Sequence, residues 1–587
     1  MSKDNIHQIL LSCGFRYTLA RHIPQESPLC KYDKSKGFYV KDYNLSGKVF
    51  RIALSIQNDP HIKLPTAYII ELPEEYKGVL MPHVNFGWYL CYVEQMEGDW
   101  DPNNLSATYS DVDHQIMSTL TNSIQSLTDG LSTKDPEMEG EFASYWVYEK
   151  EAYLLTTLPP QKVFSKLSCH SIELKNKQDL SSPDREWIIY SDIEKDGVAL
   201  WTIQRNLEIT EKSYYVDSAY FKITPILLDA KSWPPEGLKQ LFDWLSSVDP
   251  NGCRRILKYL SSKPNTKKHM LLLDIENQDI IGVLVELNLG ALSLKSHKYN
   301  PKQRRLLFAL SSKTATRSFE RFKITKADKD TILHRNMPRS RSGNLNKKKI
   351  ALIGCGTIGG YTAELLLRSG AGCEGGCFHL FDSDSFGAHN FGRHCLTTAS
   401  IGSNKASAVT ASLNSSTHIK KNIYGFAFNF PVESNILRKY DIIIDATGRP
   451  PISKRLAAVV RKIEKNERPL LIHGFNDGNG RASKVLIDDG NSCYGCLLST
   501  PSLYKNNLDL RFQSLEQQAE RFISCGSSYT PYDASVSIVT AALIQEAVLN
   551  SLETTFPWTY NEHMFDGSRS RKSRLLPPNI NCTICHE

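Results

Sequence analysis

The sequence predicts an α/β protein with an N-terminal α+β domain, an α/β connecting domain and a C-terminal domain built on a parallel sheet. The strongest signal is a short apolar run at residues 350–353, which is typical of a strand buried on both faces of a parallel sheet. A glycine-rich turn and a helical pattern follow this run directly. The length of 587 residues corresponds to about three to four domains. We expect them at residues 1–160, 161–330 and 331–587.

The composition is that of a globular protein with a mild basic excess of +7. Short basic clusters at residues 339–341 and 569–574 are more typical of solvated loops than of a nucleic-acid interface, so we expect no direct nucleic-acid contact. The sequence shows no signal-peptide pattern and no apolar run long enough for a membrane span. Without a secretory segment, its 14 cysteines indicate reduced thiols and a cytoplasmic protein.

The N-terminal part alternates helical and strand-like patterns. Roughly the first twenty residues are expected to form a helix, and residues 111–127 form another helical pattern. Residues 48–56 and 67–72 have strand patterns bounded by proline-containing turns. An apolar segment then leads to Cys91 and to a Trp-x-Pro turn at residues 100–102.

This order of elements resembles the core of the ubiquitin-conjugating enzymes. The resemblance implies that Cys91 forms a thioester and that His83 and Asn85 occupy the place of that family's His-Pro-Asn segment. Here Val84 stands where the family has proline, and Asn85 lies closer to the cysteine than usual. A cysteine among apolar residues is by itself more often a packing residue, so the catalytic interpretation depends on the rest of the chain. A conjugating cysteine exchanges thioesters and needs only a modestly lowered thiol pKa.

The middle of the chain is the least informative part. An amphipathic helical pattern at residues 235–245 begins with proline. Strand patterns occur at residues 187–190, 199–203, 220–225, 269–274 and 279–287. Alternating strands and helices indicate a second α/β unit, and it has no glycine fingerprint of its own. We interpret it as a connecting domain, a candidate degenerate partner of the C-terminal domain, without catalytic chemistry.

The C-terminal glycines have the spacing of a dinucleotide-fold phosphate loop. Gly354, Gly356 and Gly359 follow the predicted strand and precede a helical pattern at residues 360–369. Strand, glycine turn and helix start together form an anion site, because unpaired backbone N–H groups and the helix dipole point at a phosphate. The next strand pattern ends at Asp382, which suits a ribose hydroxyl. A nicotinamide-dependent dehydrogenase would look the same up to this point.

The residues after that strand distinguish a nicotinamide-dependent dehydrogenase from another class of nucleotide-binding enzyme. The motifs Asp-x-Asp, Asn-x-x-Arg and Gly-x-x-Lys follow in order and supply Asp382, Asp384, Asn390, Arg393 and Lys405. This order resembles the ATP-dependent enzymes that adenylate ubiquitin-like and sulfur-carrier proteins on a Rossmann-like domain. The resemblance implies that Asp382 or Asp384 faces the ribose and that the other three surround the ATP phosphates. Fixed cations are suited to stabilising charge that develops at a phosphoryl group.

The triphosphate also needs a hard cation, and magnesium fits. A strand pattern at residues 441–445 ends in Asp445, near the place where related enzymes carry a magnesium-binding aspartate. Gly448 follows in the turn, so Asp445 is the candidate ligand.

Related enzymes are dimers that place an arginine of the partner against ATP. The resemblance therefore implies a homodimer, with candidate arginines at Arg335, Arg339 and Arg341. A basic linker is the alternative interpretation of these residues.

Two Cys-x-x-Cys pairs predict a structural zinc site, because each short turn directs two sulfurs at one ion. The four cysteines are Cys493, Cys496, Cys582 and Cys585. The alternative, a redox pair, lacks a thioredoxin-like context. Cys525 lies between the two pairs, ahead of a small-residue helical pattern, where ubiquitin-activating relatives carry their thioester cysteine.

Together the two ends of the chain resemble bacterial fusions of ubiquitin-activating and ubiquitin-conjugating enzymes, in particular the fusion of CBASS antiphage systems. The resemblance implies adenylation of the C-terminal glycine of a cGAS-like nucleotidyltransferase. Thioesters on Cys525 and then Cys91 would follow, with transfer to a lysine or other amine. Two alternatives remain open at this point: a sulfur-carrier-protein adenylyltransferase and a nicotinamide-dependent oxidoreductase.

Overall fold

The computed structural model describes most of the chain. The described residues are 3–25, 27, 29, 32–56, 59–77, 80–85, 88–95, 97–129, 142–174, 185–207, 210–225, 233–263, 265–289, 309–310, 312, 314–335, 344–514, 521–524 and 527–585. They form two compact units, one of Met1–Asp192 with Ile209–Lys326 and one of Ile193–Glu208 with Ala327–Glu587.

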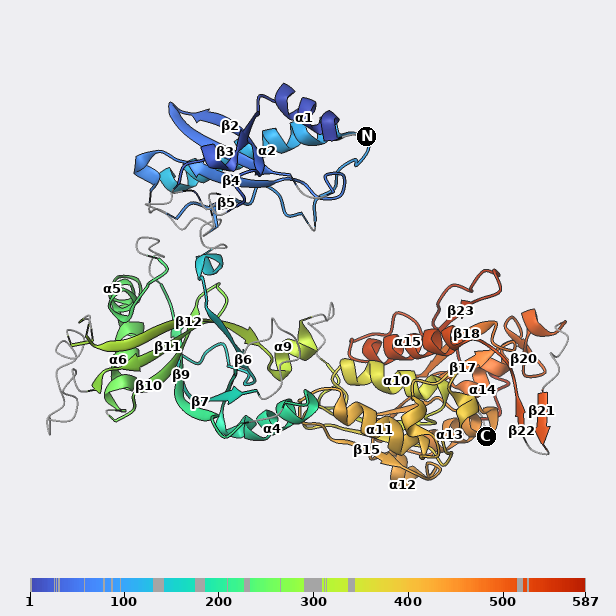
Figure 1. Cartoon of the computed structure of the whole chain (residues 1–587). Coiled ribbons are helices and arrows are strands. Elements are labelled where there is room, and N and C mark those ends of the chain that lie inside the picture. Colours follow the sequence, from blue (N-terminus) through green and yellow to red (C-terminus); the bar gives the residue numbers. More distant parts are fainter. Residues whose placement is uncertain are drawn as a thin grey trace. The chain divides into compact units, whose positions relative to one another are not determined.

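The N-terminal domain is a five-stranded antiparallel sheet in the order β1-β2-β3-β4-β5, with two helices (Figure 1). The elements are α1 (Lys3–Ser12), β1 (Arg16–Leu19), β2 (Gly37–Leu45), β3 (Lys48–Ser55), β4 (Thr66–Glu71), β5 (Tyr89–Leu90) and α2 (Leu105–Asp129). The two predicted strands correspond to β3 and β4, and α2 contains the second predicted helix. The first helix is shorter than expected, because Gly14 adopts φ +85° after it and β1 begins at once.

Alternation along β3 builds the N-terminal core. Phe50, Ile52 and Leu54 lie in the main cluster with residues of both helices, and Ala53 lies in a smaller cluster on the other face. The buried face therefore fixes the register of the strands that lead to Cys91.

The connecting domain is a closed barrel in the order β10-β11-β12-β6-β8-β7-β9. Its strands are β6 (Lys150–Leu154), β7 (Phe164–Glu173), β8 (Arg185–Tyr190), β9 (Tyr214–Ile223), β10 (Lys268–Ile275), β11 (Ile281–Leu287) and β12 (Thr316–Lys326). Met270 and Leu272 of β10 belong to a cluster shared by the barrel strands. Leu271 and Leu273 point the other way, into a cluster with α5 (Leu238–Val248) and α6 (Pro250–Ser261).

Two features of the barrel differ from the sequence-based expectations. β6 precedes residue 160, the expected end of the N-terminal domain, yet pairs with β8 and β12. The closed mixed barrel also differs from the open sheet of the C-terminal domain, so its topology gives no support to a degenerate adenylating domain.

The strand predicted at residues 199–203 is wrong, because these residues lie in helix α4 (Lys195–Gln204). Periodicity alone does not separate a strand from a buried helix in so short an apolar run. Trp201 packs edge-on against His418, with 4.8 Å between ring centroids, and Gln204 Nε2 donates to the Asn414 carbonyl over 3.1 Å. α4 therefore belongs to the second unit, although the chain places it between two barrel strands.

The C-terminal domain contains the predicted parallel sheet, in the order β15-β14-β13-β16-β17-β18-β23. Its strands are β13 (Lys349–Ile353), β14 (Cys377–Phe381), β15 (Ile423–Phe426), β16 (Ile442–Asp445), β17 (Leu470–Asp477), β18 (Ala482–Asp488) and β23 (Tyr560–Met564). The first five are parallel, and β18 and β23 add antiparallel strands at one edge.

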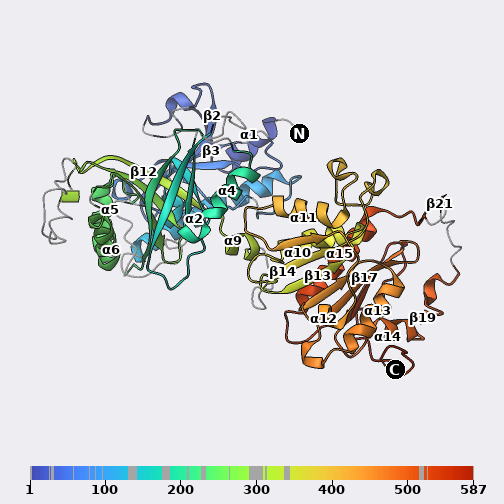
Figure 2. The same cartoon turned by 90° about the horizontal axis from the view of Figure 1, so that it is seen from below.

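Helices cover both faces of this sheet (Figure 2). One layer holds α10 (Thr357–Arg368), α11 (Lys405–Ser415) and α15 (Ala534–Asn550), and the other holds α12 (Ser434–Leu437), α13 (Pro450–Arg461) and α14 (Tyr494–Ser499). Ile350 and Leu352 of β13 face the first layer, whereas Ala351 and Ile353 face the second. Both faces of β13 are buried, as its uninterrupted apolar sequence predicts.

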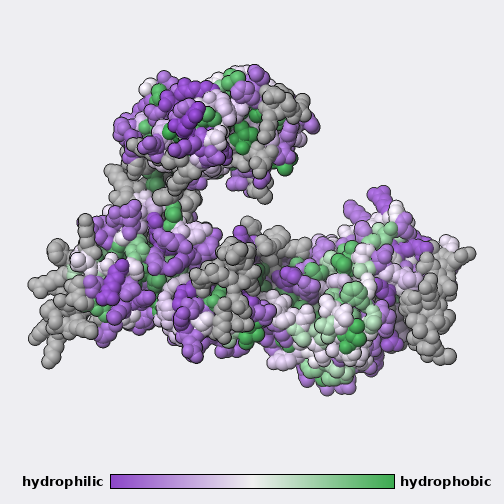
Figure 3. Space-filling view, viewed as in Figure 1, coloured by the Kyte–Doolittle hydropathy of each residue, from purple (hydrophilic) through white to green (hydrophobic). Residues whose placement is uncertain are grey.

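Smaller elements complete this domain. They are α9 (Lys329–His334), β19 (Tyr504–Lys505), β20 (Leu508–Asp509), β21 (Arg521–Ser524) and β22 (Ser527–Tyr529). No helix in the described part of the chain is long and apolar enough to cross a membrane. On the face seen in Figure 3, hydrophilic residues predominate and hydrophobic ones lie in small groups.

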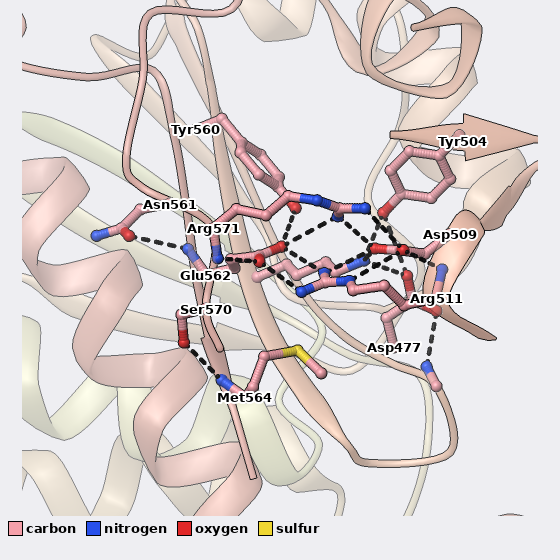
Figure 4. A network of polar contacts seen from close by, with 12 residues as sticks. Asp477, Tyr504, Asp509, Arg511, Tyr560, Asn561, Glu562, Met564, Ser570 and Arg571 are labelled. Atoms are coloured by element: carbon pink, nitrogen blue, oxygen red, sulfur yellow. Dashed lines mark hydrogen bonds and ion pairs between the residues drawn. The ribbon is translucent and has the colours of Figure 1, made fainter. Parts of the chain in front are cut away.

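A network of buried charges ties β18 and β23 to the β19–β20 hairpin (Figure 4). Lys484 Nζ donates to Asp477 and Asp509 over 2.6 and 2.7 Å and to the Tyr504 oxygen over 2.9 Å. Two arginines bridge Asp509 and Glu562, so that three cations face three carboxylates. The arginines are Arg511 and Arg571.

Candidate active site

The candidate nucleotide site lies where the strand order of the C-terminal sheet reverses. β13 is flanked by β14 on one side and β16 on the other, and all three are parallel. Their carboxyl ends therefore meet at one edge and bring the glycine turn, Asp382 and Asp445 together. In open parallel sheets this switch point is where ligands bind.

The three glycines of the turn have distinct roles. Gly354 adopts φ +87°, and a Cβ there would lie 3.2 Å from backbone atoms of Ala446 and Thr447. A Cβ on Gly359 would lie 1.8 Å from the Gly354 carbonyl oxygen, so this glycine lets the helix pack on the turn. At Gly356, the N-cap of α10, a Cβ would meet nothing within 4 Å. The open position thus lies at the helix N-terminus, where backbone N–H groups attract an anion.

Asp382 holds the glycine turn in place. Its two oxygens accept the backbone N–H groups of Cys355 and Asp384, over 2.7 and 2.8 Å. Asn404 donates to the carbonyls of Asp382 and Asp384 and caps α11 through its oxygen. The predicted pair Asp382 and Asp384 is therefore brought to the turn.

Lys405 is the first residue of α11, and its side chain is only 12% exposed. Its Nζ lies 3.2 Å from Asp384, whose side chain is 71% exposed. The ammonium group is thus held near the glycine turn by a carboxylate that remains largely in water. A phosphate could replace such a partner at modest cost, since exposed ion pairs contribute little.

Asn390 and Arg393 lie in the segment between β14 and α11. The Asn390 side-chain oxygen accepts the Gly387 N–H over 2.9 Å, which shapes the loop. Arg393 Nη1 donates to the Thr530 carbonyl over 2.8 Å, and its guanidinium lies 4.4 Å from the ring centroid of Tyr532.

Asp445 is buried at the end of β16, with 1% of its side chain exposed. One oxygen accepts the N–H and hydroxyl of Thr447, and the other pairs with Ser453 and His473. Burial alone raises the pKa of Asp445, but the hydrogen bonds from His473, Ser453 and Thr447 more than offset it and hold the pKa below its usual value. Both oxygens are thus committed to the protein, and these contacts do not fit a magnesium ligand.

The two Cys-x-x-Cys pairs meet in space. The sulfurs of Cys493 and Cys582 lie 3.5 Å apart, those of Cys496 and Cys585 also 3.5 Å, and all four lie within 4.8 Å of one another. Zinc–sulfur bonds of about 2.3 Å in a tetrahedron separate sulfurs by about 3.8 Å. The cluster is compatible with zinc, and the Asn579 N–H, 3.4 Å from the Cys496 sulfur, adds an outer contact.

Cys91 follows β5 in the N-terminal domain and is half-buried. Its N–H donates to the His83 carbonyl over 2.7 Å, and its sulfur lies 3.9 Å from the Val93 carbonyl oxygen. His83 adopts φ +62°. The Asn85 N–H donates to the Tyr89 carbonyl over 2.9 Å, and the Tyr89 N–H donates to the Asn85 side-chain oxygen over 3.3 Å. The segment predicted to flank the cysteine is thus folded back beside it.

Several predicted residues lie outside the described part of the chain. They are Cys525, Arg339 and Arg341. Strands β21 and β22 pair on either side of Cys525. Arg335 caps the C-terminus of α9 and is exposed.

Comparisons with known proteins cover both ends of the chain. Residues 13–155 match Prokaryotic E2 family B, and residues 329–582 match the ThiF family. An ATP-dependent ubiquitin transferase-like protein Cap2 from Vibrio cholerae is 49% identical, with 100% of both chains covered. The Cap2 protein of Escherichia coli is 42% identical, again over 100% of both chains. The chain belongs to the Cap2 family.

Membership confirms the expected combination of a ubiquitin-conjugating-type domain with an adenylating domain. The chain is an ATP-dependent activating and conjugating enzyme of the ubiquitin-transferase-like kind. A solved structure of E. coli MccB with ATP aligns at 20% identity over 42% of this chain and 68% of that one, with a TM-score of 0.31.

Sequence reasoning missed Tyr532 and His473. Tyr532 contacts Arg393 although the two residues lie far apart along the chain, and no motif marks it. His473 lies in the middle of β17, opposite Asp445 in the register. A histidine within an apolar strand is the one signal that could have singled it out.

Proposed function

We propose that this enzyme adenylates the C-terminal glycine of a partner protein and conjugates that protein to an amine. The observation that carries the proposal is a glycine turn with an open position at Gly356, with Lys405 held by Asp384 and with Arg393 linked to the start of α10 through Tyr532. Fixed cations beside backbone N–H groups suit the negative charge of a triphosphate and of the departing pyrophosphate. Asp382 or Asp384 would face the ribose of the nucleotide.

The reaction begins when the glycine carboxylate attacks the α-phosphate of ATP. An acyl-adenylate forms and pyrophosphate leaves. The Cys525 thiolate then attacks the acyl carbon, AMP leaves and a thioester results. Cys91 accepts the acyl group by thiol exchange, and an acceptor amine, a lysine side chain by expectation, forms the final amide. Each covalent step replaces one difficult acylation by easier ones.

The proposed partner is a cGAS-like nucleotidyltransferase with a C-terminal glycine, and the proposed setting is CBASS antiviral defence in the cytoplasm. Both come from the family resemblance, and the relatives' name, ubiquitin transferase-like, is consistent with a protein substrate. A homodimer is proposed on the same ground. Magnesium is expected with ATP, and it would arrive on the nucleotide rather than on Asp445.

ATP–pyrophosphate exchange by the full chain tests the first step. Exchange should require a partner protein or peptide that ends in glycine, and removal of that glycine should abolish it. No exchange with any glycine-terminated partner would contradict the proposal. Production of a thiocarboxylate in the presence of a sulfur donor would instead favour the sulfur-carrier alternative, whose plant relative MOCS3 is 32% identical over 27% of this chain. Family membership sets the oxidoreductase alternative aside.

Non-reducing gels test the order of the cysteines. Cys91→Ala should leave a thioester on Cys525, and Cys525→Ala should leave adenylate alone. Cys13→Ala is a control, since this cysteine is also partly buried in the N-terminal domain. Normal conjugation by Cys91→Ala would contradict the assignment.

Zinc is proposed as a structural ion at the Cys493, Cys496, Cys582 and Cys585 cluster, where it would tie the C-terminal tail to α14. Metal analysis of the full chain should find one zinc per chain, and Cys493→Ser should lose it and lower the melting temperature. Full zinc content in that variant would contradict the proposal.

A further inference from the structure

Tyr532 lies between the candidate phosphate-binding arginine and the helix start of the nucleotide site. It follows β22 and precedes α15, so it belongs to the segment that leaves the Cys525 region. Its ring lies 4.4 Å from the Arg393 guanidinium, and its hydroxyl lies 3.3 Å from Thr357 Oγ1. Thr357 is the first residue of α10, next to the open position at Gly356. One side chain thus contacts both the candidate arginine and the start of α10.

The contact fixes Arg393 without consuming its donors. A tyrosine ring attracts a guanidinium through the negative charge of its π face, so the contact does not depend on any one of the five N–H donors. One of them donates to the Thr530 carbonyl over 2.8 Å. The remaining edge of the group is suited to a phosphate oxygen. Because Arg393 is already held in place before the nucleotide binds, binding does not have to order its side chain.

The Tyr532 side chain packs against Gly480. Gly480, in the turn between β17 and β18, adopts φ +84°. A Cβ at this glycine would lie 2.4 Å from the Tyr532 Cβ and 2.9 Å from its Cγ. The absence of a side chain at Gly480 is therefore what allows the ring to sit where it meets Arg393.

We propose that Tyr532 is a positioning residue of the nucleotide site, which holds Arg393 beside the start of α10 in the arrangement that receives the ATP phosphates. The inference rests on the proposed adenylation site. It makes that site depend on the segment between Cys525 and α15, and it assigns a role to a residue outside the recognised motifs.

The test is a set of nucleotide titrations with the full chain. Affinity for ATP is measured by calorimetry in magnesium-containing buffer, and affinity for adenosine by competition with a fluorescent ATP analogue. Tyr532→Leu removes the ring and should weaken ATP binding about 3- to 30-fold, the range of a desolvated cation–π contact, while adenosine binding stays unchanged. Tyr532→Phe keeps the ring and should restore most of the affinity.

The decisive comparison adds Arg393→Gln and the double variant Arg393→Gln/Tyr532→Leu. If Tyr532 acts through Arg393, the double variant binds ATP no more weakly than Arg393→Gln alone. The inference would be overturned if the loss of ATP affinity in the double variant equalled the product of the two single losses. An equal loss of adenosine affinity in Tyr532→Leu would overturn it as well. Tyr424→Leu, at an exposed tyrosine of β15, is the matched control and should bind ATP as the wild type does. Failure of the wild type itself to bind ATP would count against the proposed function instead.

Discussion

Two lysines of the C-terminal domain carry the same charge in opposite surroundings. Lys484 is 0% exposed and contacts Asp477, Asp509 and the Tyr504 hydroxyl in the charge network. Lys405 is 12% exposed, and its one carboxylate contact among the described residues is with Asp384, itself 71% exposed. Lys484 is thus fully paired by protein, whereas Lys405 is held by a partner that water already solvates.

We propose that the difference separates a structural charge, Lys484, from a charge that binds a ligand, Lys405. A buried ion needs all its partners from the protein, because its desolvation cost is several kcal/mol. A cation that must receive a ligand needs an exchangeable partner and an open direction. The open position at Gly356, in the turn that Asp382 holds, is the candidate for that direction. Variants of the two lysines should therefore affect different quantities.

The largest effect is expected for Lys484→Met on stability. The substitution removes the ammonium group that pairs with Asp477 and one of the three cations that contact Asp509. Removing one partner of a buried ion pair costs about 3–5 kcal/mol. Urea unfolding of the full chain, followed by a probe of the C-terminal domain, measures this loss. Lys505→Met, at an exposed lysine of β19, is the control and should change stability by less than about 0.5 kcal/mol. If Lys484→Met were as stable as the wild type, Lys484 would not be a structural charge and the contrast with Lys405 would fail.

Lys405→Met should lower the activity and leave the stability nearly unchanged. ATP–pyrophosphate exchange is expected to fall about 10²- to 10³-fold, the loss typical of a deleted electrostatic donor. The free energy of unfolding should stay within about 0.5 kcal/mol of the wild type. Lys420→Met, at an exposed lysine beyond α11, should leave both unchanged. If Lys405→Met lost stability and kept exchange, the lysine would be structural.

A pH titration sharpens the comparison. Burial raises the pKa of Asp509, but hydrogen bonds from Arg511 and Arg571 and the charge of Lys484 more than offset it, so the pKa lies well below its usual value. The pKa of Glu562 is lowered for similar reasons, with burial opposing and Arg511 prevailing.

Carboxyls with depressed pKa values stabilise the fold above their unfolded pKa and lose this contribution as pH falls. Stability of the C-terminal domain should therefore decrease progressively below about pH 4.5. Urea midpoints between pH 7 and pH 3 measure it. In Glu562→Gln the urea midpoint should fall less steeply at acid pH than in the wild type. An unchanged dependence on pH would argue that the charge network is not the cause of the acid destabilisation.

The smallest effect is expected for Asp384→Asn on stability. Its carboxylate is mostly exposed, and such ion pairs contribute about 0–1 kcal/mol. Thermal unfolding should show a shift near the detection limit. A clear destabilisation would mean that the Lys405–Asp384 pair is structural and would erase the contrast with Lys484.

Much of the fold and part of the candidate site could be predicted from the sequence. The run at residues 350–353 and the glycines after it gave β13, the turn and α10, because both signals are local. The paired Cys-x-x-Cys motifs met as predicted, since each pair is preset by its own short turn. Helix α4 was missed, because its apolar run packs against α11 and the residues after it, a distant part of the chain.

By itself the sequence determined the order of the domains, the glycine turn, the cysteine pairs and the family. These depend on spacing along the chain, which a turn or a strand–helix junction converts directly into geometry. Only the tertiary structure decided that Asp445 is saturated by Thr447, Ser453 and His473. It also decided that Arg393 lies over the Tyr532 ring and that Lys484 is fully paired. Such contacts join residues far apart in sequence, and their strength depends on burial and on partner count, which no local pattern records.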